Sequence, residues 1–90
     1  MRLSDDAIAQ TLDGLHEWRR ESDEIVMERS FPTYKDGLVF ANAVGWIADG
    51  MDHHPDLLVG YRKVGIRVST HSEGGVTEKD FELARRIAAL

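Results

Sequence analysis

The chain has 90 residues, which is the size of one domain, so one small hydrophobic core is expected to carry the fold. Its 11 basic and 16 acidic side chains give a net charge of -5, and the basic ones are scattered, which is unlike the clustered Lys and Arg of nucleic-acid-binding proteins. Cysteine is absent, which excludes disulfides, thiolate nucleophiles and cysteine-ligated metals. No apolar run approaches the ~20 residues of a membrane span, and the start of the chain is acidic, so we expect a cytoplasmic protein without a membrane partner.

The first third of the chain predicts a helix followed by a β-hairpin. Ser4, followed by two aspartates, is a typical helix N-cap, and Ile8 and Leu12 recur at helical spacing. Residues 18–21 and 25–31 have the composition of strands, and Ser22-Asp23 between them is typical of a turn.

Residues 34–51 predict a long helix that is apolar on more than one face. Thr33 begins it with capping-box spacing, and Pro55 requires it to end at about residue 52 or 53. A helix that covers one sheet needs only one apolar stripe, so we expect a second copy of the chain to cover the other face. The apolar residues that almost encircle the helix are Leu38, Val39, Phe40, Ala41, Ala43, Val44, Trp46, Ile47, Ala48 and Met51.

The last third predicts a second hairpin and a capped helix. Residues 57–61 and 64–68 alternate between apolar and polar side chains, with a tight turn expected near Arg62-Lys63. Thr77 and Asp80 have capping-box spacing ahead of a helix whose core side is Phe81, Ala84, Ile87 and Ala88. The expected fold class is therefore α+β, with a four-stranded, mostly antiparallel sheet and helices packed on one face.

Histidine placement is the clearest functional signal in the sequence. His53 and His54 close the long helix and His71 closes the last predicted strand, whereas His16 stands alone. Asp49 lies four residues before His53, so both are expected on one helix face, where the carboxylate would fix the tautomer of the ring. With the negative end of the helix dipole nearby, His53 is a candidate acid or base near neutral pH.

Two other interpretations of these histidines stay open at this point. Adjacent histidines are often solvated surface residues, and a histidine at a strand end often serves packing. A metal site is the chemical variant, because neutral imidazole is a common metal ligand. The chain has no His-x-x-x-His pair, however, and the adjacent pair cannot face one ion from a regular element.

The stretch from Asp49 to Asp80 resembles a known signature. An acidic residue, three spacers, His-His-Pro, an aromatic residue, a further His and an Asp occur here as Asp49, His53-His54-Pro55, Tyr61, His71 and Asp80. Three flanking segments match the signature as well: Tyr61-Arg62-Lys63-Val64, Ser69-Thr70-His71 and Gly75-Val76-Thr77-Glu78-Lys79-Asp80-Phe81. This pattern resembles the pterin-4a-carbinolamine dehydratase family over nearly the whole chain.

The resemblance implies a fold, an assembly and a reaction. The family fold is α-β-β-α-β-β-α, and its members form dimers or tetramers. The reaction is the dehydration of 4a-hydroxytetrahydropterin to quinonoid dihydropterin, which recycles the cofactor of aromatic amino-acid hydroxylases. The substrate is then a pterin, with no cofactor and no metal, and a hydroxylase is the implied pathway partner. Some relatives act instead as dimerisation or assembly factors for other proteins.

By the same resemblance the catalytic residues are His53, His54 and His71. His53 and His71 would be the acid–base pair, while His54 orients the pterin and Asp49 orients His53. The residues implied to line the substrate pocket are Pro55, Thr70, Ser72 and Glu73. Asp80 is favoured as a helix-cap residue. Many relatives carry Glu where this chain has the shorter Asp49.

Overall fold

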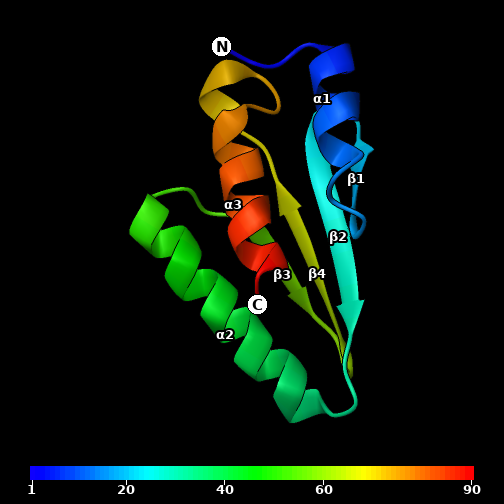
Figure 1. Ribbon diagram of the computed structural model, residues 1–90. Coiled ribbons are helices and arrows are strands. Elements are labelled where there is room, and N and C mark those ends of the chain that lie inside the picture. Colours follow the sequence, from blue (N-terminus) through cyan, green and yellow to red (C-terminus); the bar gives the residue numbers. More distant parts are fainter.

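The computed structural model describes residues 1–90 and shows the predicted order of elements (Figure 1). A short 3-10 turn, η1, separates the last strand from the last helix. The elements are α1 (Asp5–Leu12), β1 (Trp18–Glu21), β2 (Glu24–Ser30), α2 (Tyr34–Met51), β3 (Asp56–Val59), β4 (Lys63–Val68), η1 (His71–Glu73) and α3 (Glu78–Ala88).

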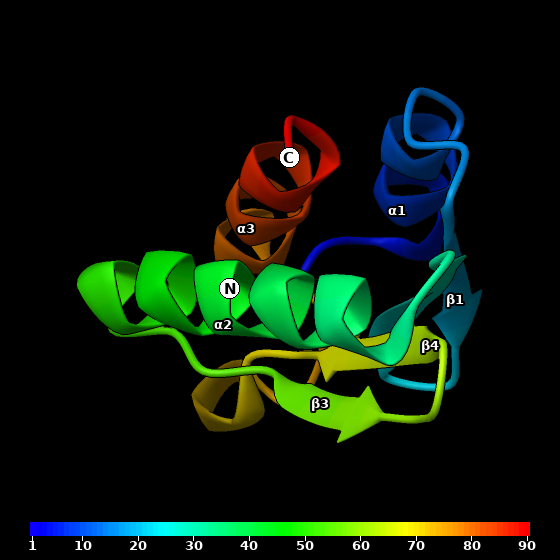
Figure 2. The same cartoon turned by 90° about the horizontal axis from the view of Figure 1, so that it is seen from below.

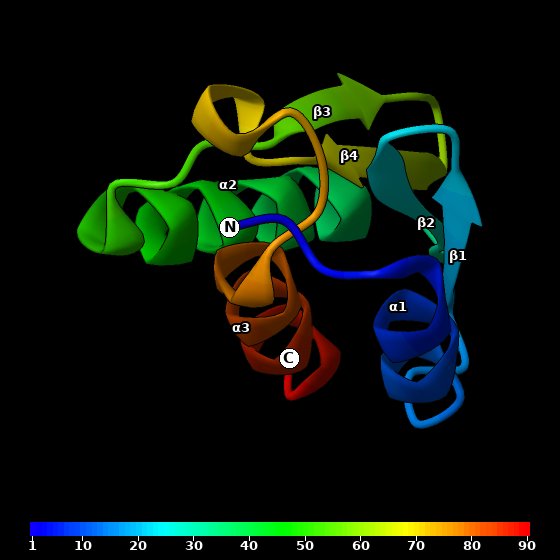
Figure 3. The ribbon, with the colours of Figure 1, turned by 90° about the horizontal axis from the view of Figure 1, so that it is seen from above.

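The four strands form one antiparallel sheet in the order β1-β2-β4-β3. The central pair is β2 and β4, in which Ile25 lies opposite Val68 and Met27 opposite Ile66. The helices lie on one face of this sheet and leave the other face open (Figures 2 and 3). The predicted fold class is confirmed.

Alternation along the central strands builds the core between the sheet and the helices. Ile25, Met27, Val64, Ile66 and Val68 are at most 2% exposed, because side chains two apart in a strand point to the same face. The side chains that α3 contributes to the same core are Phe81, Leu83, Ala84 and Ile87. Each fully buried side chain of this size contributes about 1.5–3 kcal/mol, so the sheet and α3 form a rigid base for the loops at their ends.

Threonine and serine side chains begin the helices where the sequence predicts. Ser4 Oγ accepts from the Ala7 backbone N–H, and Thr33 Oγ1 accepts from the N–H of Asp36. At α3 both halves of a capping box are present, with the Asp80 carboxylate accepting from the Thr77 N–H. The prediction of this cap is confirmed.

Several predicted boundaries are wrong by a few residues. The strand predicted to reach Tyr61 ends at Val59, because the turn occupies residues 60–62 and the Gly60 N–H bonds to the Lys63 carbonyl. His71 does not close β4, which ends at Val68, and lies in η1 instead. On α3, Leu83 is buried and Ala88 is exposed, the reverse of the predicted core side at these positions.

The long helix α2 buries one apolar face and leaves another exposed. Phe40, Val44 and Ala48 are buried against the core, whereas Val39 is 64% exposed and Trp46 76% exposed. The second apolar face predicted from the sequence is therefore present and uncovered in the single chain. No helix in the structure combines the length and the apolar character needed to cross a membrane.

Candidate active site

The antiparallel pairing of β3 and β4 brings the predicted site segments to one end of the sheet. Asp56, the first residue of β3, lies opposite Arg67, the penultimate residue of β4. The segment that directly precedes β3 holds His53, His54 and Pro55. The segment that follows β4 holds Thr70 and His71. Segments 15 or more residues apart in the chain therefore meet at this end.

The end of α2 turns sharply and redirects His53. Asp52 is the C-cap residue and has a left-handed backbone, with φ of 51°. Aspartate tolerates this conformation better than most residues, and the His53 N–H closes the helix by donating to the Ala48 carbonyl. His53 thus leaves the helical path, and its ring is carried toward the start of α3.

A buried carboxylate holds the ring of His53. The Nε2 atom of His53 lies 2.6 Å from Oδ1 of Asp80, and the two side chains are 11% and 0% exposed. Because a carboxylate only accepts hydrogen bonds, the proton of a neutral His53 ring lies on Nε2. Nδ1 is then the nitrogen left free to take or give a proton.

Asp80 has partners on its other oxygen as well. Oδ2 accepts from the Thr70 hydroxyl at 2.9 Å and from the Thr77 backbone N–H at 2.8 Å. The carboxylate also lies in the first turn of α3, where the helix dipole favours negative charge. The cap role predicted for Asp80 is confirmed, and the same side chain is also the partner of His53.

The predicted pairing of Asp49 with His53 is wrong. Asp49 Oδ1 lies 3.1 Å from Nε2 of His54, in a pair whose side chains are 83% and 58% exposed. The expectation assumed that the helix continues through His53, whereas the left-handed turn at Asp52 rotates His53 away from the face that carries Asp49.

His71 lies in the short turn that follows β4. Gly74 closes this turn with φ of 74°, a left-handed conformation that glycine adopts without steric cost. The His71 side chain is exposed and no hydrogen bond joins its ring to His53 or His54. It borders a hollow of about 310 Å³ whose other lining residues are Ser22, Asp23, Glu24, Ser69, Gly74 and Gly75.

Three of the residues expected to line a substrate pocket share a neighbouring hollow. Thr70, Ser72 and Glu73 border a space of about 250 Å³, and Pro55 lies outside it. Glu73 forms an ion pair of 2.6 Å with the amino group of Met1, and this hydrogen bond holds the pKa of Glu73 below its ordinary value. Thr70 is buried, and its hydroxyl donates to Asp80.

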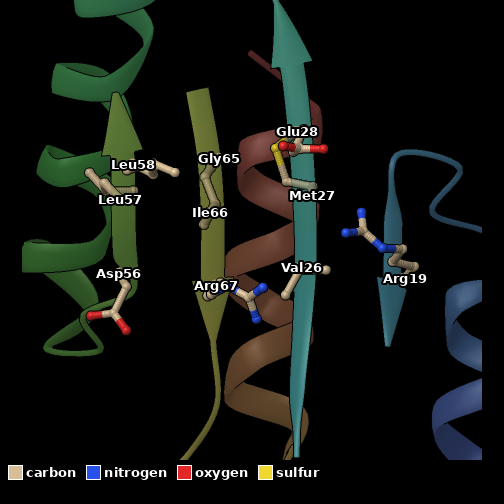
Figure 4. Close-up of a pocket in the computed structure, with 10 residues that line it drawn as sticks. All are labelled: Arg19, Val26, Met27, Glu28, Asp56, Leu57, Leu58, Gly65, Ile66 and Arg67. Atoms are coloured by element: carbon tan, nitrogen blue, oxygen red, sulfur yellow. The ribbon is translucent and has the colours of Figure 1, made fainter. Parts of the chain in front are cut away.

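A further hollow lies on the open face of the sheet. Figure 4 shows its lining side chains, with α3 behind the sheet. It has a volume of about 360 Å³ and is bordered by side chains of all four strands, among them Arg19, Val26, Leu58 and Arg67. None of its lining residues is a histidine, although Asp56 and Arg67, the strand pair next to the candidate site, border it.

The arrangement suits proton transfer at an edge of the molecule. His53 offers one free ring nitrogen with its orientation fixed, and the rings of His54 and His71 are exposed. No group of three or more His, Asp or Glu side chains is arranged to hold a metal ion. The fold and site together define a small α+β protein with a carboxylate-held histidine.

The chain belongs to the pterin-4-alpha-carbinolamine dehydratase family, whose family model (described as pterin 4 alpha carbinolamine dehydratase) matches residues 1–90. A relative from Metallosphaera sedula is 45% identical over 99% of this chain and 93% of its own length. A relative from Natronomonas pharaonis is 43% identical over 99% of this chain and 95% of its own length. The assignment of both as pterin-4-alpha-carbinolamine dehydratases is itself an inference.

Two solved structures resemble this fold. One is described as a transcriptional coactivator/pterin dehydratase from Brucella melitensis; it is 30% identical with a TM-score of 0.94, over 99% of this chain and 97% of that one. The other is a pterin dehydratase-like protein described as a RuBisCO assembly factor in the alpha-carboxysome. It is 19% identical with a TM-score of 0.65, covers 80% of this chain and 83% of that one, and shows the fold alone.

Proposed function

We propose that the protein is a dehydratase that converts pterin-4a-carbinolamine to quinonoid dihydropterin and water by histidine acid–base catalysis. Membership of the family over the whole chain supports the substrate class. The proposal of acid–base catalysis rests on the 2.6 Å hydrogen bond between His53 and the fully buried Asp80. A buried carboxylate that fixes a partly exposed imidazole is the arrangement that a general acid or base requires.

The reaction is balanced by the transfer of two protons. The bond between C4a and its hydroxyl oxygen breaks, the hydroxyl takes up a proton and leaves as water, and the adjacent ring nitrogen loses a proton as the C=N bond forms. In this proposal His53, through Nδ1, and His71 carry out the two transfers, each contributing about 10²–10⁴ in rate. No oxidant or reductant is consumed.

The remaining predicted residues bind the pterin in this proposal. The exposed ring of His54, paired with Asp49, orients the heterocycle. Pro55, Ser72 and Glu73 line the site, and Thr70 contributes its backbone. An aromatic amino-acid hydroxylase is the class of enzyme that would generate the carbinolamine.

A non-catalytic assembly role is the second candidate, and the exposed apolar side chains favour it. Trp46 and Leu58 are each 76% exposed, on α2 and on the edge strand β3. Isolated exposed apolar residues are ordinary, but contiguous apolar patches mark interaction surfaces, and α2 exposes Leu38, Val39 and Trp46 together.

The experiment that separates the two candidates is a dehydration assay. Chemically generated 4a-hydroxytetrahydropterin is supplied, and the ultraviolet change on dehydration is followed with and without the protein. The proposal expects acceleration over the spontaneous rate that is insensitive to a chelator. Folded wild-type protein that leaves the spontaneous rate unchanged would favour the assembly role, and loss of activity on chelation would favour a metal-dependent site.

A further inference from the structure

A buried pair of threonine hydroxyls lies behind the His53–Asp80 pair. Thr70 and Thr77 are 6% and 7% exposed, and their Oγ1 atoms are 2.7 Å apart. Thr77 is needed as the N-cap of α3, where its Oγ1 accepts from the Lys79 N–H. Thr70 caps no helix with its side chain, and its hydroxyl instead lies 2.9 Å from Oδ2 of Asp80.

The direction of each hydrogen bond in this group follows from the donors available. Asp80 only accepts, so the single hydroxyl proton of Thr70 is donated to Asp80. Thr70 must then accept the hydroxyl proton of Thr77. The chain of bonds therefore runs from Thr77 through Thr70 to Asp80 and meets the Nε2–H of His53 at the other carboxylate oxygen.

We propose that Thr70 is a positioning residue for His53: its hydroxyl holds the Asp80 carboxylate so that the His53 proton stays on Nε2 and Nδ1 is free. Its kinetic consequence rests on the proposed dehydratase function, whereas its effect on the His53 tautomer does not. The role differs from the substrate contact that the family resemblance implies for Thr70, because both hydrogen bonds of its side chain are internal. Since Thr70 directly precedes His71, the same hydroxyl anchors the segment that carries the second histidine.

The tautomer of His53 can be read directly by NMR. Long-range ¹H–¹⁵N spectra of the imidazole rings distinguish Nε2–H from Nδ1–H, and a His53→Ala sample assigns the peaks. Thr70→Val removes the hydroxyl at nearly constant shape, and Thr70→Ser keeps it. We expect Nε2–H in the wild type and Thr70→Ser, and a ratio of Nε2–H to Nδ1–H that is lowered about three- to tenfold in Thr70→Val.

The dehydration assay supplies the kinetic readout. Thr70→Val is expected to lower kcat about tenfold, and to change KM less than about twofold. This loss is a part of the about 10²–10⁴-fold rate acceleration that a well-placed acid or base contributes. Thr70→Ser should restore kcat. Thr33→Ala, which removes a helix cap far from His53, controls for destabilisation and should leave the tautomer and kcat unchanged.

Each outcome separates this inference from the proposed function. An unchanged His53 tautomer in folded Thr70→Val overturns the positioning role whatever the activity. A shifted tautomer in a protein without dehydratase activity supports the positioning role and contradicts the proposed function. If Thr70→Val does not fold, the wild type decides: a slowly exchanging Thr70 hydroxyl proton supports the role, and a rapidly exchanging one overturns it.

Discussion

Two carboxylates lie within hydrogen-bond reach of histidines at this site, and their surroundings differ sharply. Asp80 is 0% exposed and 2.6 Å from His53, whereas Asp49 is 83% exposed and 3.1 Å from His54. An exposed ion pair contributes little, because water screens it and ordering the side chains costs entropy. Water does not screen the buried Asp80–His53 pair in this way, so Asp80 is the carboxylate that fixes the orientation of an imidazole ring.

Replacing each carboxylate by its amide tests this difference. Asp80→Asn keeps the shape but cannot accept from all three of its donors, so kcat of the proposed reaction should fall about 10²-fold. Asp49→Asn, as the matched control, should change kcat less than about twofold. The measurement is steady-state kinetics on both variants, with circular dichroism to verify folding. Equal losses in the two variants would contradict the account.

The candidate site was only partly predictable from the sequence. The three histidines could be recognised from the pattern, and so could the cap formed by Thr77 and Asp80. The predicted place of His71 at the end of a strand was wrong, because His71 lies in η1. The partner of His53 could not be recognised, because it comes from 27 residues further along the chain. Spacing on a helix predicts a contact only while the backbone stays helical, and Asp52 ends the helix one residue before His53.

One ion pair joins the segment before β1 to β2. Arg29 donates to both carboxylate oxygens of Glu17, at 2.8 and 2.5 Å, and its guanidinium lies 4.6 Å from the centre of the Phe40 ring. The hydrogen bond from Arg29 is the main cause that lowers the pKa of Glu17 below its ordinary value. Arg29 thus connects β2 both to the segment before β1 and to α2.

This pair predicts a dependence of stability on pH. Because the pKa of Glu17 is lower in the folded state, its contribution is present above the unfolded value and is lost as pH falls through the folded value. Glu17→Gln should lower the free energy of unfolding at pH 7 by about 0.5–1 kcal/mol, and by less at pH 3. Urea unfolding at both pH values measures this difference.

The control for Glu17→Gln is Gln10→Ala, because Gln10 is exposed and its side chain does not titrate. It should show no such pH-dependent difference from the wild type. A difference between Glu17→Gln and the wild type that stays constant from pH 7 to pH 3 would refute the assignment.

The types of the helices and strands were predictable, because the residues that share a face in the sequence pattern are the ones buried in the core. The residues at which the elements end were not predictable. The period-two pattern of residues 64–68 matches β4, whose buried residues are Val64, Ile66 and Val68. Tyr61 continues the same alternation from β3 but lies in the turn, where the backbone bond between Gly60 and Lys63 ends the strand. Where a hairpin closes depends on cross-strand register, which periodicity within one strand does not contain.

The uncovered apolar side of α2 predicts that the chain associates with further copies of itself. Val39, Leu38 and Trp46 are 64%, 41% and 76% exposed. Light scattering should give a mass of two or four times the 10.1 kDa of the chain. Trp46→Glu, which places a charge on this surface, should lower the mass, and Asp13→Asn should not. A monomeric wild type would contradict this prediction.

The central claim, that His53 and His71 transfer the protons of the dehydration, is tested most directly by removing each ring. His53→Ala and His71→Ala should each lower kcat about 10²–10⁴-fold, and His16→Ala, which removes a histidine outside the site, should leave it unchanged. The rates are measured on 4a-hydroxytetrahydropterin with variants whose folding is verified by circular dichroism. Wild-type rates in folded His53→Ala or His71→Ala would contradict the account.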